Sequence, residues 1–585
     1  MSRPVRIANC SGFYGDRFRA ARDMVEGGPI DVLTGDYLAE LTMLILWKAR
    51  NKDPEAGYAR TFLAQAEQVI GTCLDRGIKV VTNAGGLNPR GLAAQLSALA
   101  DRLGLQVRVA HIEGDDIVER IPAWMADGHQ FQHLDDCRSL ASARVHPVTA
   151  NAYLGGWGIV EALGEGADIV VCPRITDASL VVGPAAWWHK WGRDDYDALA
   201  GAVAAGHVIE CGPQATGGNY AWLDEIVDRR YPGFPIAEVE ADGSSVITKH
   251  EGTGGLVSPG TVTAQLLYEI AAPDYPNADV RAHFDTTQLT QIGPDRVRMS
   301  GTRGSAPPDT LKVAVNYIGG YRNAMTIVVT GLDIEEKARW AEDLLFDELG
   351  GRDQFDAVDV RLARLDRQDA QTAELASAQL TVSVKDRDRT KVGRRFSEAA
   401  TALFLGSFAG FHTTTPPSAE REFGVYWPTL VPSSLVEHRV VLPDGSTRVV
   451  AGNTTTGESE RPALLELALP EVPGGEVRLE PLGRVCAARS GDKGGNANVG
   501  LWTRDAVAYS WLRETMSVDL FSALLPESQG LEVRRFELPN LWAVNFVIVG
   551  LLGEGVASST RPDPQAKGLG EYLRSRFVEI PVSLL

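Results

Sequence analysis

Several features that mark common protein classes are missing from this 585-residue chain. No apolar stretch reaches the roughly 18 to 20 residues that a membrane-spanning helix needs. The N-terminus leads directly into a strand-like segment and lacks the apolar core of a signal peptide. The six cysteines are scattered without a CxxC pair, which favours reduced thiols over a disulfide framework. Together these absences predict a cytoplasmic protein with no membrane association.

Positive charge is also scarce. Lysine and arginine number 57 against 76 aspartates and glutamates, which gives a net charge of −19. Nucleic-acid binding needs clustered basic residues, so this balance argues against a nucleic-acid partner, although a local positive pocket for a small anion remains compatible with it. Neither the GxGxxG motif nor the P-loop motif occurs. The prediction is therefore non-redox chemistry without a bound cofactor.

The chain instead repeats one pattern five times in its first 180 residues. A short Val-, Ile- or Leu-rich segment ends, and a loop rich in Gly, Asp, Asn or Arg follows. Apolar segments that alternate with helices are typical of buried parallel strands. Such sheets bind ligands outside the carboxyl ends of their strands, so these loops predict the position of a site. The five segments are residues 5–9, 30–33, 78–81, 107–112 and 167–172.

The pattern changes farther along the chain and predicts an α/β protein of several regions. A doubly wound, mostly parallel sheet is expected first, then a Gly/Pro-rich subdomain, and then a β–α–β–β–α segment of ferredoxin-like order. A Pro- and Gly-containing linker at residues 469–480 precedes a small α+β domain. The predicted bounds are 1–225, 226–309 and 310–455 within an N-terminal region 1–455, and 478–585 for the C-terminal domain.

Carboxylates follow several of the predicted strands. Asp36 and Glu40, four residues apart, would share one helix face and could perform acid/base work or hold Mg²⁺. The helix dipole alone also favours acids in a first turn, so a purely structural role stays open. Asp115 follows the fourth segment. After the fifth segment, Arg174 and Asp177 could clamp a carboxylate, or could pair with each other to close the loop.

Residues 206–212 hold the densest group of reactive side chains. His207, Glu210 and Cys211 permit general acid/base or nucleophilic roles. A cysteine before glycine is more often a small core residue, so the two polar residues are the stronger candidates. This segment contains only one histidine, and no second ligand has the spacing of a zinc site, so no metal is predicted. The candidate catalytic residues are Asp36, Asp115, Asp177, His207 and Glu210.

Four Gly-rich loops are candidate ligand contacts. Their backbone amides could face an anion or an acyl oxygen, although sharp turns and flexible hairpins also need glycine. The loop at residues 489–498 combines charges with small residues and is longer than a two-residue hairpin turn requires. We expect it to lie against the N-terminal region. The candidate ligand-binding residues are Asn83, Gly85, Gly86, Arg174, Thr216, Gly217, Gly218, Lys249, Ser490, Asp492, Lys493 and Asn496.

Long motifs in this order resemble the acyclic terpene utilisation (AtuA-like) family. They include GFYGDR at 12–17, GDYLAELTM at 35–43, TNAGGLNP at 82–89, GADIVVCPRITDASLVVGP at 166–184, GHVIECGPQATGGNY at 206–220, and ARSGDKGGNANVG at 488–500. Pro173 stands before Arg174 where the family often has glycine. The resemblance implies a cytoplasmic catabolic role beside enzymes that activate, carboxylate and degrade branched or isoprenoid acyl-CoA thioesters.

Two functions follow from these observations. The first is an enzyme, of lyase, hydratase or hydrolase type, that acts on a branched acyl-CoA or a related acid by non-redox acid/base chemistry. The second is a non-catalytic partner or assembly subunit of a biotin-dependent acyl-CoA carboxylase pathway. The convergent acids, amides and arginine favour the enzyme. A homo-oligomer is expected, with a small-molecule or acyl-CoA ligand, and Mg²⁺ is the less favoured alternative to a metal-free site.

Overall fold

The structure is a computed structural model that describes residues 3–453, 461–464 and 467–585. Residues 1 and 455, the predicted first and last residues of the N-terminal region, lie outside the described residues. The chain forms two compact units. The first comprises Met1–Asn316, Tyr426–Val556 and Asp563–Leu585, and the second comprises Tyr317–Val425 and Ala557–Pro562. All candidate site residues belong to the first unit.

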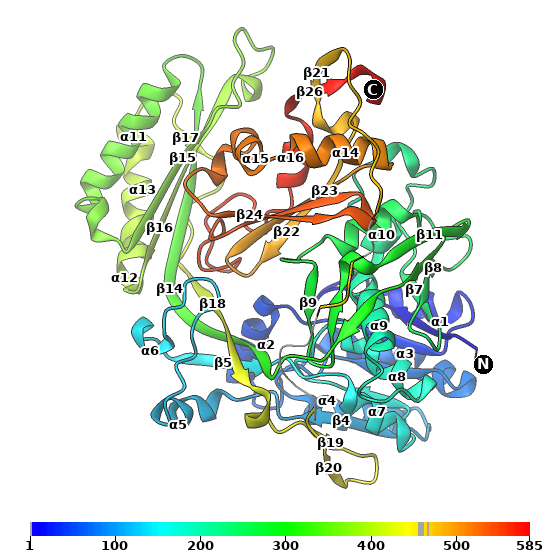
Figure 1. Cartoon of the computed structure of the whole chain (residues 1–585). Helices are drawn as coiled ribbons and strands as arrows, with labels where there is room; N and C mark the ends of the chain where they lie inside the picture. The colour runs from blue at the N-terminus through cyan, green and yellow to red at the C-terminus, as the bar shows by residue number, and fades with distance from the viewer. Residues whose placement is uncertain (1–2, 454–460, 465–466) are drawn as a thin grey trace. The chain divides into compact units, whose positions relative to one another are not determined.

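Five parallel strands form the centre of the first unit, in the order β1-β2-β3-β6-β4. Of these strands, Figure 1 labels β4. Each of the five overlaps one of the apolar segments of the sequence. Buried Val, Ile, Leu and Ala line both faces of the sheet. The strands are β1 (Val5–Asn9), β2 (Val32–Gly35), β3 (Lys79–Thr82), β4 (Val109–Glu113) and β6 (Ile169–Val171).

The predicted doubly wound parallel sheet is confirmed for this centre, but six antiparallel strands extend it into a mixed sheet of eleven, so the sheet as a whole is not mostly parallel. Short hairpin connections produce this result, since they can join only antiparallel neighbours. Residues 226–309, predicted as a separate subdomain, supply four of these strands beside β1. The added strands are β7 (Pro235–Val239), β8 (Ser245–Lys249), β11 (Gln288–Gly293), β12 (Arg296–Ser300), β19 (Arg439–Val441) and β20 (Thr447–Val449).

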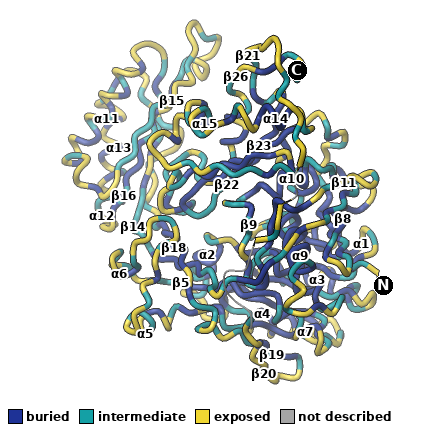
Figure 2. The backbone as a smooth tube through the Cα atoms, viewed as in Figure 1, coloured by how far each residue is buried: buried dark blue, intermediate teal, exposed yellow. Residues whose placement is uncertain are grey.

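Helices cover both faces of the parallel centre, and alternate side chains of its strands enter two different cores. Val80 joins the core that contains α1, α3 and α4, whereas Val81 joins the core that contains α7, α8 and α9. Figure 2 shows α9 in the buried colour along most of its length. The helices are α1 (Ala20–Glu26), α3 (Arg60–Arg76), α4 (Pro89–Arg102), α7 (Trp157–Gly164), α8 (Ser179–His189) and α9 (Tyr196–Ile209).

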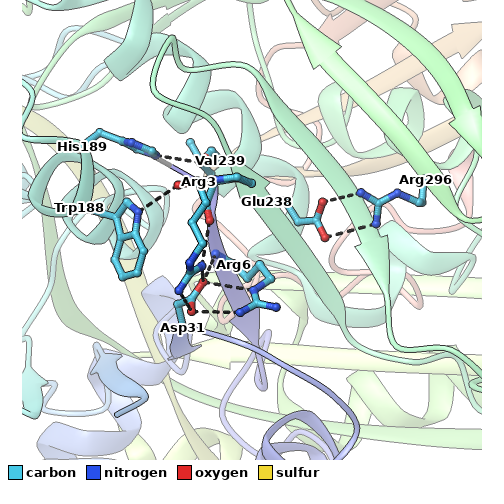
Figure 3. Close-up of polar contacts among 9 residues, drawn as sticks. Arg3, Arg6, Asp31, Trp188, His189, Glu238, Val239 and Arg296 are labelled. Carbon is cyan, nitrogen blue, oxygen red and sulfur yellow. Dashed lines mark hydrogen bonds and ion pairs between the residues drawn. The ribbon is translucent and has the colours of Figure 1, made fainter. Parts of the chain in front are cut away.

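Ion pairs close the amino-terminal edge of the sheet, which is the edge opposite the predicted site (Figure 3). Asp31, just before β2, accepts hydrogen bonds from the side chains of Arg3 and Arg6. Glu238 on β7 pairs with Arg296 on β12. These charged side chains are paired with one another, so we assign this edge a structural role.

Shorter elements complete the large sheet's surroundings. Helix α2 begins at Glu40, so Asp36 precedes the helix, and the predicted helical face shared by these two residues is wrong. Strand β5 ends at Ala152, and helix α7 begins only at Trp157. The elements are α2 (Glu40–Lys52), α5 (Ile121–Ala126), α6 (Leu140–Ala143), β5 (Pro147–Ala152), α10 (Pro259–Leu266), β9 (Asp274–Pro276), β10 (Arg281–His283) and β13 (Arg303–Ser305).

The second unit is built on a sheet with the order β15-β16-β14-β17, and α11 and α13 share its apolar core. Residues 310–330 form one continuous strand, β14. Its glycines and polar residues remain extended within it. The elements are β14 (Thr310–Thr330), α11 (Ile334–Leu349), β15 (Ala357–Ala363), β16 (Ser377–Asp386), α12 (Arg389–Val392), α13 (Arg394–Gly406), β17 (His412–Thr413) and β18 (Arg421–Pro432).

The C-terminal residues form an antiparallel sheet, β22-β23-β25-β24, that belongs to the first unit. Strand β22 lies beside α10 of the N-terminal region (Figure 1). The described residues contain no helix long and apolar enough to cross a membrane. The elements are β21 (Val477–Pro481), β22 (Ala487–Lys493), β23 (Asn496–Trp502), α14 (Ala506–Thr515), α15 (Val518–Leu524), β24 (Val533–Leu538), β25 (Ala543–Ile548), α16 (Leu569–Arg574) and β26 (Phe577–Pro581).

Candidate active site

The end of helix α9 delivers two reactive residues to the carboxyl edge of the sheet. Gly206 permits the approach, because a Cβ at this position would lie 2.7 Å from the Cα of Ala178. Asn9, the last residue of β1, donates its side-chain amide to the carbonyls of Ile209 (2.7 Å) and Glu210 (3.0 Å). The amide satisfies terminal carbonyls of the helix and fixes the direction in which it ends.

His207 and Glu210 form a buried pair at this helix end. His207 Nδ1 lies 3.2 Å from Glu210 Oε1, but neither imidazole nitrogen makes a hydrogen bond of normal geometry among the described residues. Burial lowers the pKa of His207 to about 4 and raises the pKa of Glu210 well above its usual range. The pair therefore favours a neutral imidazole beside a protonated carboxyl. A carboxyl group in this state can donate a proton to a bound substrate.

Asp36 and Asn83 meet where the neighbouring strands β2 and β3 end. Asn83 Nδ2 donates to Asp36 Oδ1 at 2.6 Å, and Asn83 Oδ1 accepts from the backbone N–H of Tyr37 at 2.8 Å. Burial and the nearby charge of Asp177 raise the pKa of Asp36 well above its usual range. Both side-chain atoms of Asn83 that form hydrogen bonds are therefore occupied, one by Asp36 and one by the turn that follows β2.

Arg174 organises the loop after β6. Its Nη1 lies 2.5 Å from Asp177 Oδ1 and 3.3 Å from the carbonyl oxygen of Leu38, and its guanidinium lies 4.1 Å from the centre of the Tyr153 ring. Only 2% of the residue is exposed. Of the two roles that the sequence leaves open for Arg174 and Asp177, the structure displays the pairing with each other. The backbone N–H of Arg174 also donates to the carboxylate of Asp115.

The C-terminal domain contributes two charged residues from a tight hairpin. Lys493 pairs with Asn496 across the turn Gly494-Gly495, so the long loop predicted at 489–498 is wrong: most of it is strand. Burial and the charge of Lys312 lower the pKa of Lys493. Burial and the charge of Glu269 raise the pKa of Asp492 to about 7. Among the described residues, no carboxylate oxygen lies within 4.0 Å of Lys493 Nζ.

Two buried asparagines of the C-terminal sheet hold the chain around Glu269. Asn498 accepts the backbone N–H of Glu269 at 2.8 Å and donates to the carbonyl of Leu267 at 2.8 Å. Asn545 bonds to Asn498 and to the carbonyl of Ala271. Glu269 has φ of 56°, a left-handed conformation that non-glycine residues rarely adopt. Such strain persists only where surrounding contacts enforce it, and it often marks functional sites.

Lys312 lies beside Glu40 and two tyrosine rings. Lys312 Nζ lies 3.7 Å from Glu40 Oε1, 4.8 Å from the Tyr153 ring centre and 5.7 Å from that of Tyr426. Burial alone would raise the pKa of Glu40, but the charges of Lys312 and Arg174 outweigh it and lower the value to about 2. Glu40 therefore stays ionised as the partner of these cations.

We call these residues together the charged cluster. Each of them changes the pKa of at least one other member or has its own pKa changed by the others. Its carboxyl groups span strongly raised and strongly lowered pKa values, and a site with that spread can hold acids and bases side by side at neutral pH. The members are Asp36, Glu40, Arg174, Asp177, His207, Glu210, Glu269, Lys312, Asp492, Lys493 and Lys567.

Comparison with known families decides the relationship of the chain. Residues 5–442 match the family described as "Acyclic terpene utilisation family protein AtuA", and residues 480–579 match the AtuA ferredoxin-like domain. The chain belongs to the acyclic terpene utilisation family. A comparison with curated proteins finds no match. In this AtuA family member the charged cluster takes residues from both matched regions.

Several predicted residues lie outside the charged cluster. Lys249 pairs with Asp295 at 3.0 Å beside a surface cavity of about 430 Å³. The amide of Gly86 donates to the carbonyl of Asn83 inside its own turn. Ser490 bonds to the carbonyl of Lys567, and Asn496 bonds to Asp135. Local hydrogen bonds or close packing likewise occupy Gly85, Thr216, Gly217 and Gly218. Ligand contact by these eight residues stays a prediction.

The cluster also contains residues that the AtuA-family motifs did not suggest as candidates. Lys312 lies in a strand, and Glu269 follows a helix inside an apolar stretch, so neither has a local sequence signal. Tyr153 lies against the Arg174 guanidinium, and the Tyr275 ring lies tilted against that of His207 with ring centres 5.1 Å apart. Among the described residues no three His, Cys, Asp or Glu side chains are grouped as metal ligands.

Asp115 makes stability depend on pH. Burial and the charge of Asp116 raise its pKa to about 7, whereas the unfolded carboxyl titrates near pH 4. The native state therefore holds a proton that the unfolded state has lost, and stability falls between about pH 4 and pH 7. Asp115→Asn cannot ionise and can still accept from Asn151 and Arg174. We expect the free energy of unfolding of this variant to exceed that of the wild type by up to about 4 kcal/mol at pH 8.

Urea unfolding at pH 5 and pH 8 measures this difference. At pH 5 the two proteins should unfold at similar urea concentrations, because the wild-type carboxyl is still protonated. Asp101→Asn, an exposed change on α4, is the control and should follow the wild type at both pH values. Equal destabilisation of Asp115→Asn at both pH values would contradict a protonated Asp115.

Proposed function

We propose that this protein is a cytoplasmic enzyme that performs non-redox acid/base chemistry on a branched or isoprenoid acyl-CoA thioester or a related acid. The observation that carries the proposal is the buried His207–Glu210 pair within the charged cluster. Its imidazole nitrogens and Glu210 Oε2 have no hydrogen-bond partner in the described structure, although each of these atoms is inaccessible to solvent. Buried polar atoms without partners are costly, and catalytic sites are places where that cost is tolerated.

The roles follow from the charges. Glu210, kept protonated by burial, would give a proton to the substrate, and the neighbouring neutral His207 would take a proton or orient the carboxyl. Asp36, held by Asn83, is a second carboxyl with a raised pKa. Lys493 would hold negative charge on the substrate, because a cation in a buried site acts strongly on such charge. These roles suit a lyase, hydratase or hydrolase reaction.

The substrate class rests on family membership. The family's description names the utilisation of acyclic terpenes, which are branched isoprenoid compounds. The thioester comes from the resemblance to proteins that work beside acyl-CoA-degrading enzymes. No dinucleotide-binding motif occurs in the sequence, which agrees with a reaction without hydride transfer.

Deuterium incorporation tests the function even while the product is unidentified. The full-length protein is incubated in D₂O with branched acyl-CoA thioesters, straight-chain thioesters and the free branched acids, and mass spectrometry follows each compound. An acid/base enzyme is expected to introduce deuterium or to form product with the branched compounds first. If no compound exchanges or reacts faster than in buffer, the proposal fails.

The alternative is a non-catalytic partner or assembly subunit in a biotin-dependent acyl-CoA carboxylase pathway. We also propose that the protein assembles as a homo-oligomer, since symmetric assembly is common among oligomeric proteins. Light scattering of the protein purified from its native cells separates these possibilities. A homo-oligomer gives a multiple of 63.1 kDa. A stoichiometric carboxylase subunit in the same particle, without deuterium exchange, would favour the alternative.

A further inference from the structure

The charged cluster has one strong cation that is already neutralised. Arg174 is paired with Asp177, bonded to the Leu38 carbonyl and stacked on Tyr153. These contacts hold its guanidinium, so it is poorly placed to be the principal partner of an anionic substrate group. A substrate anion would need other cations in the cluster.

Two lysines from distant parts of the chain lie near Tyr426 and Tyr275. Lys312 Nζ lies 5.7 Å from the ring centre of Tyr426, and Lys493 Nζ lies 5.6 Å from that of Tyr275. Gly494, the residue after Lys493, packs so closely on Tyr426 that a Cβ there would lie 3.2 Å from Tyr426 Cε1. Lys312 is paired with Glu40, whereas Lys493 has no carboxylate within 4.0 Å among the described residues, and burial and the charge of Lys312 lower its pKa. A bound anion would neutralise the charge that Lys493 leaves unpaired.

Tyr426 adds a donor that has no protein partner in the part of the chain that the structure describes. Only 7% of the residue is exposed, and its buried hydroxyl lies near the Tyr153 phenol without a hydrogen bond of normal geometry. A buried hydroxyl usually finds a partner, so this group and the two lysines together are arranged for an acceptor that the chain itself does not provide.

We infer that Lys312, Lys493 and Tyr426 bind a free carboxylate of the substrate, which is separate from the acyl group that Glu210 protonates. This inference rests on the proposed function and narrows it to acids or thioesters that carry an additional carboxylate. Two ammonium groups and one hydroxyl suit the two oxygens of a carboxylate. The cluster also holds carboxylates that stay ionised, such as Glu40 beside Lys312, so a doubly charged phosphate would meet stronger repulsion than a carboxylate.

Calorimetric binding of 3-methylglutarate, a short branched dicarboxylate, tests the subsite. Lys493→Met and Lys312→Met are each expected to weaken its affinity about 10- to 100-fold, which is the usual effect of losing a charge-assisted bond. Tyr426→Phe keeps the ring and should weaken the affinity for 3-methylglutarate about 3- to 10-fold. Lys52→Met, an exposed change at the end of α2, is the matched control and should bind like the wild type.

The other arms of the experiment make the outcome decisive. The monomethyl ester should bind more weakly than the diacid, and inorganic phosphate at equal ionic strength should not displace it. Unchanged affinity in both lysine variants, or displacement by phosphate at equal concentration, would overturn the inference. If a lysine variant fails to fold, Tyr426→Phe decides the result. Absence of deuterium exchange in the wild type would instead refute the proposed function while leaving these binding results intact.

Discussion

Glu210→Gln is expected to slow the reaction about 100- to 10,000-fold while the protein stays folded. Burial raises the pKa of the Glu210 carboxyl well above its usual range and so favours its protonated form, and glutamine is a neutral group of nearly the same shape. The substitution therefore removes the transferable proton without adding or removing charge in the native protein. Its unfolding free energy should equal or slightly exceed that of the wild type.

The measurement is the rate of deuterium incorporation into a responsive branched acyl-CoA, together with thermal unfolding of each variant. Glu67→Gln, on the exposed face of α3, is the matched control and should retain the full rate. A Glu210→Gln protein that exchanges deuterium at the wild-type rate would remove Glu210 from the chemistry. An unfolded variant would show instead that Glu210 supports the fold.

Arg174→Met is expected to destabilise the protein by about 3–5 kcal/mol. The change leaves the Leu38 carbonyl and the partly exposed Asp177 carboxylate without the buried guanidinium that pairs with both, and such unpaired groups are costly. Arg174→Lys should also be destabilising, because lysine keeps the charge but cannot reproduce the planar contact with Tyr153 and the bonds in two directions.

Urea unfolding at pH 7 checks this prediction. Arg90→Met removes an arginine whose side chain is 76% exposed and is the control, which should change stability by less than about 1 kcal/mol. If Arg174→Met unfolds like the control but loses ligand affinity, Arg174 is a ligand-binding residue whose partners in the structure are replaceable.

The sequence predicted the parallel strands well because each one is buried on both faces and leaves a continuous apolar segment. Strand β1 has the predicted bounds, Val5–Asn9. The mixed character of the sheet was not predictable in the same way. Strands β7, β8, β11 and β12 lie among Gly- and Pro-rich turns, and their pairing with β1 depends on contacts between distant segments.

The candidate site shows the same division. Asp36, Arg174 and Glu210 follow apolar segments, so the rule for open α/β sheets placed them near one another. Lys312 and Glu269 enter the cluster only through tertiary packing, since their neighbours in the sequence carry no polar motif. The glycines and asparagines of the Lys493 hairpin are poor strand formers, so they predict a long loop where the structure has two strands. The buried contacts of Asn498 outweigh that preference.

A structure of Glu210→Gln with a bound branched acyl-CoA or carboxylic acid tests the central claim most directly, because a slow variant retains its substrate. The account predicts the acyl carbonyl within hydrogen-bonding distance of residue 210 and the free carboxylate between Lys312 and Lys493. A ligand bound instead in the cavity beside Lys249 and Asp295, with the charged cluster unchanged, would contradict it.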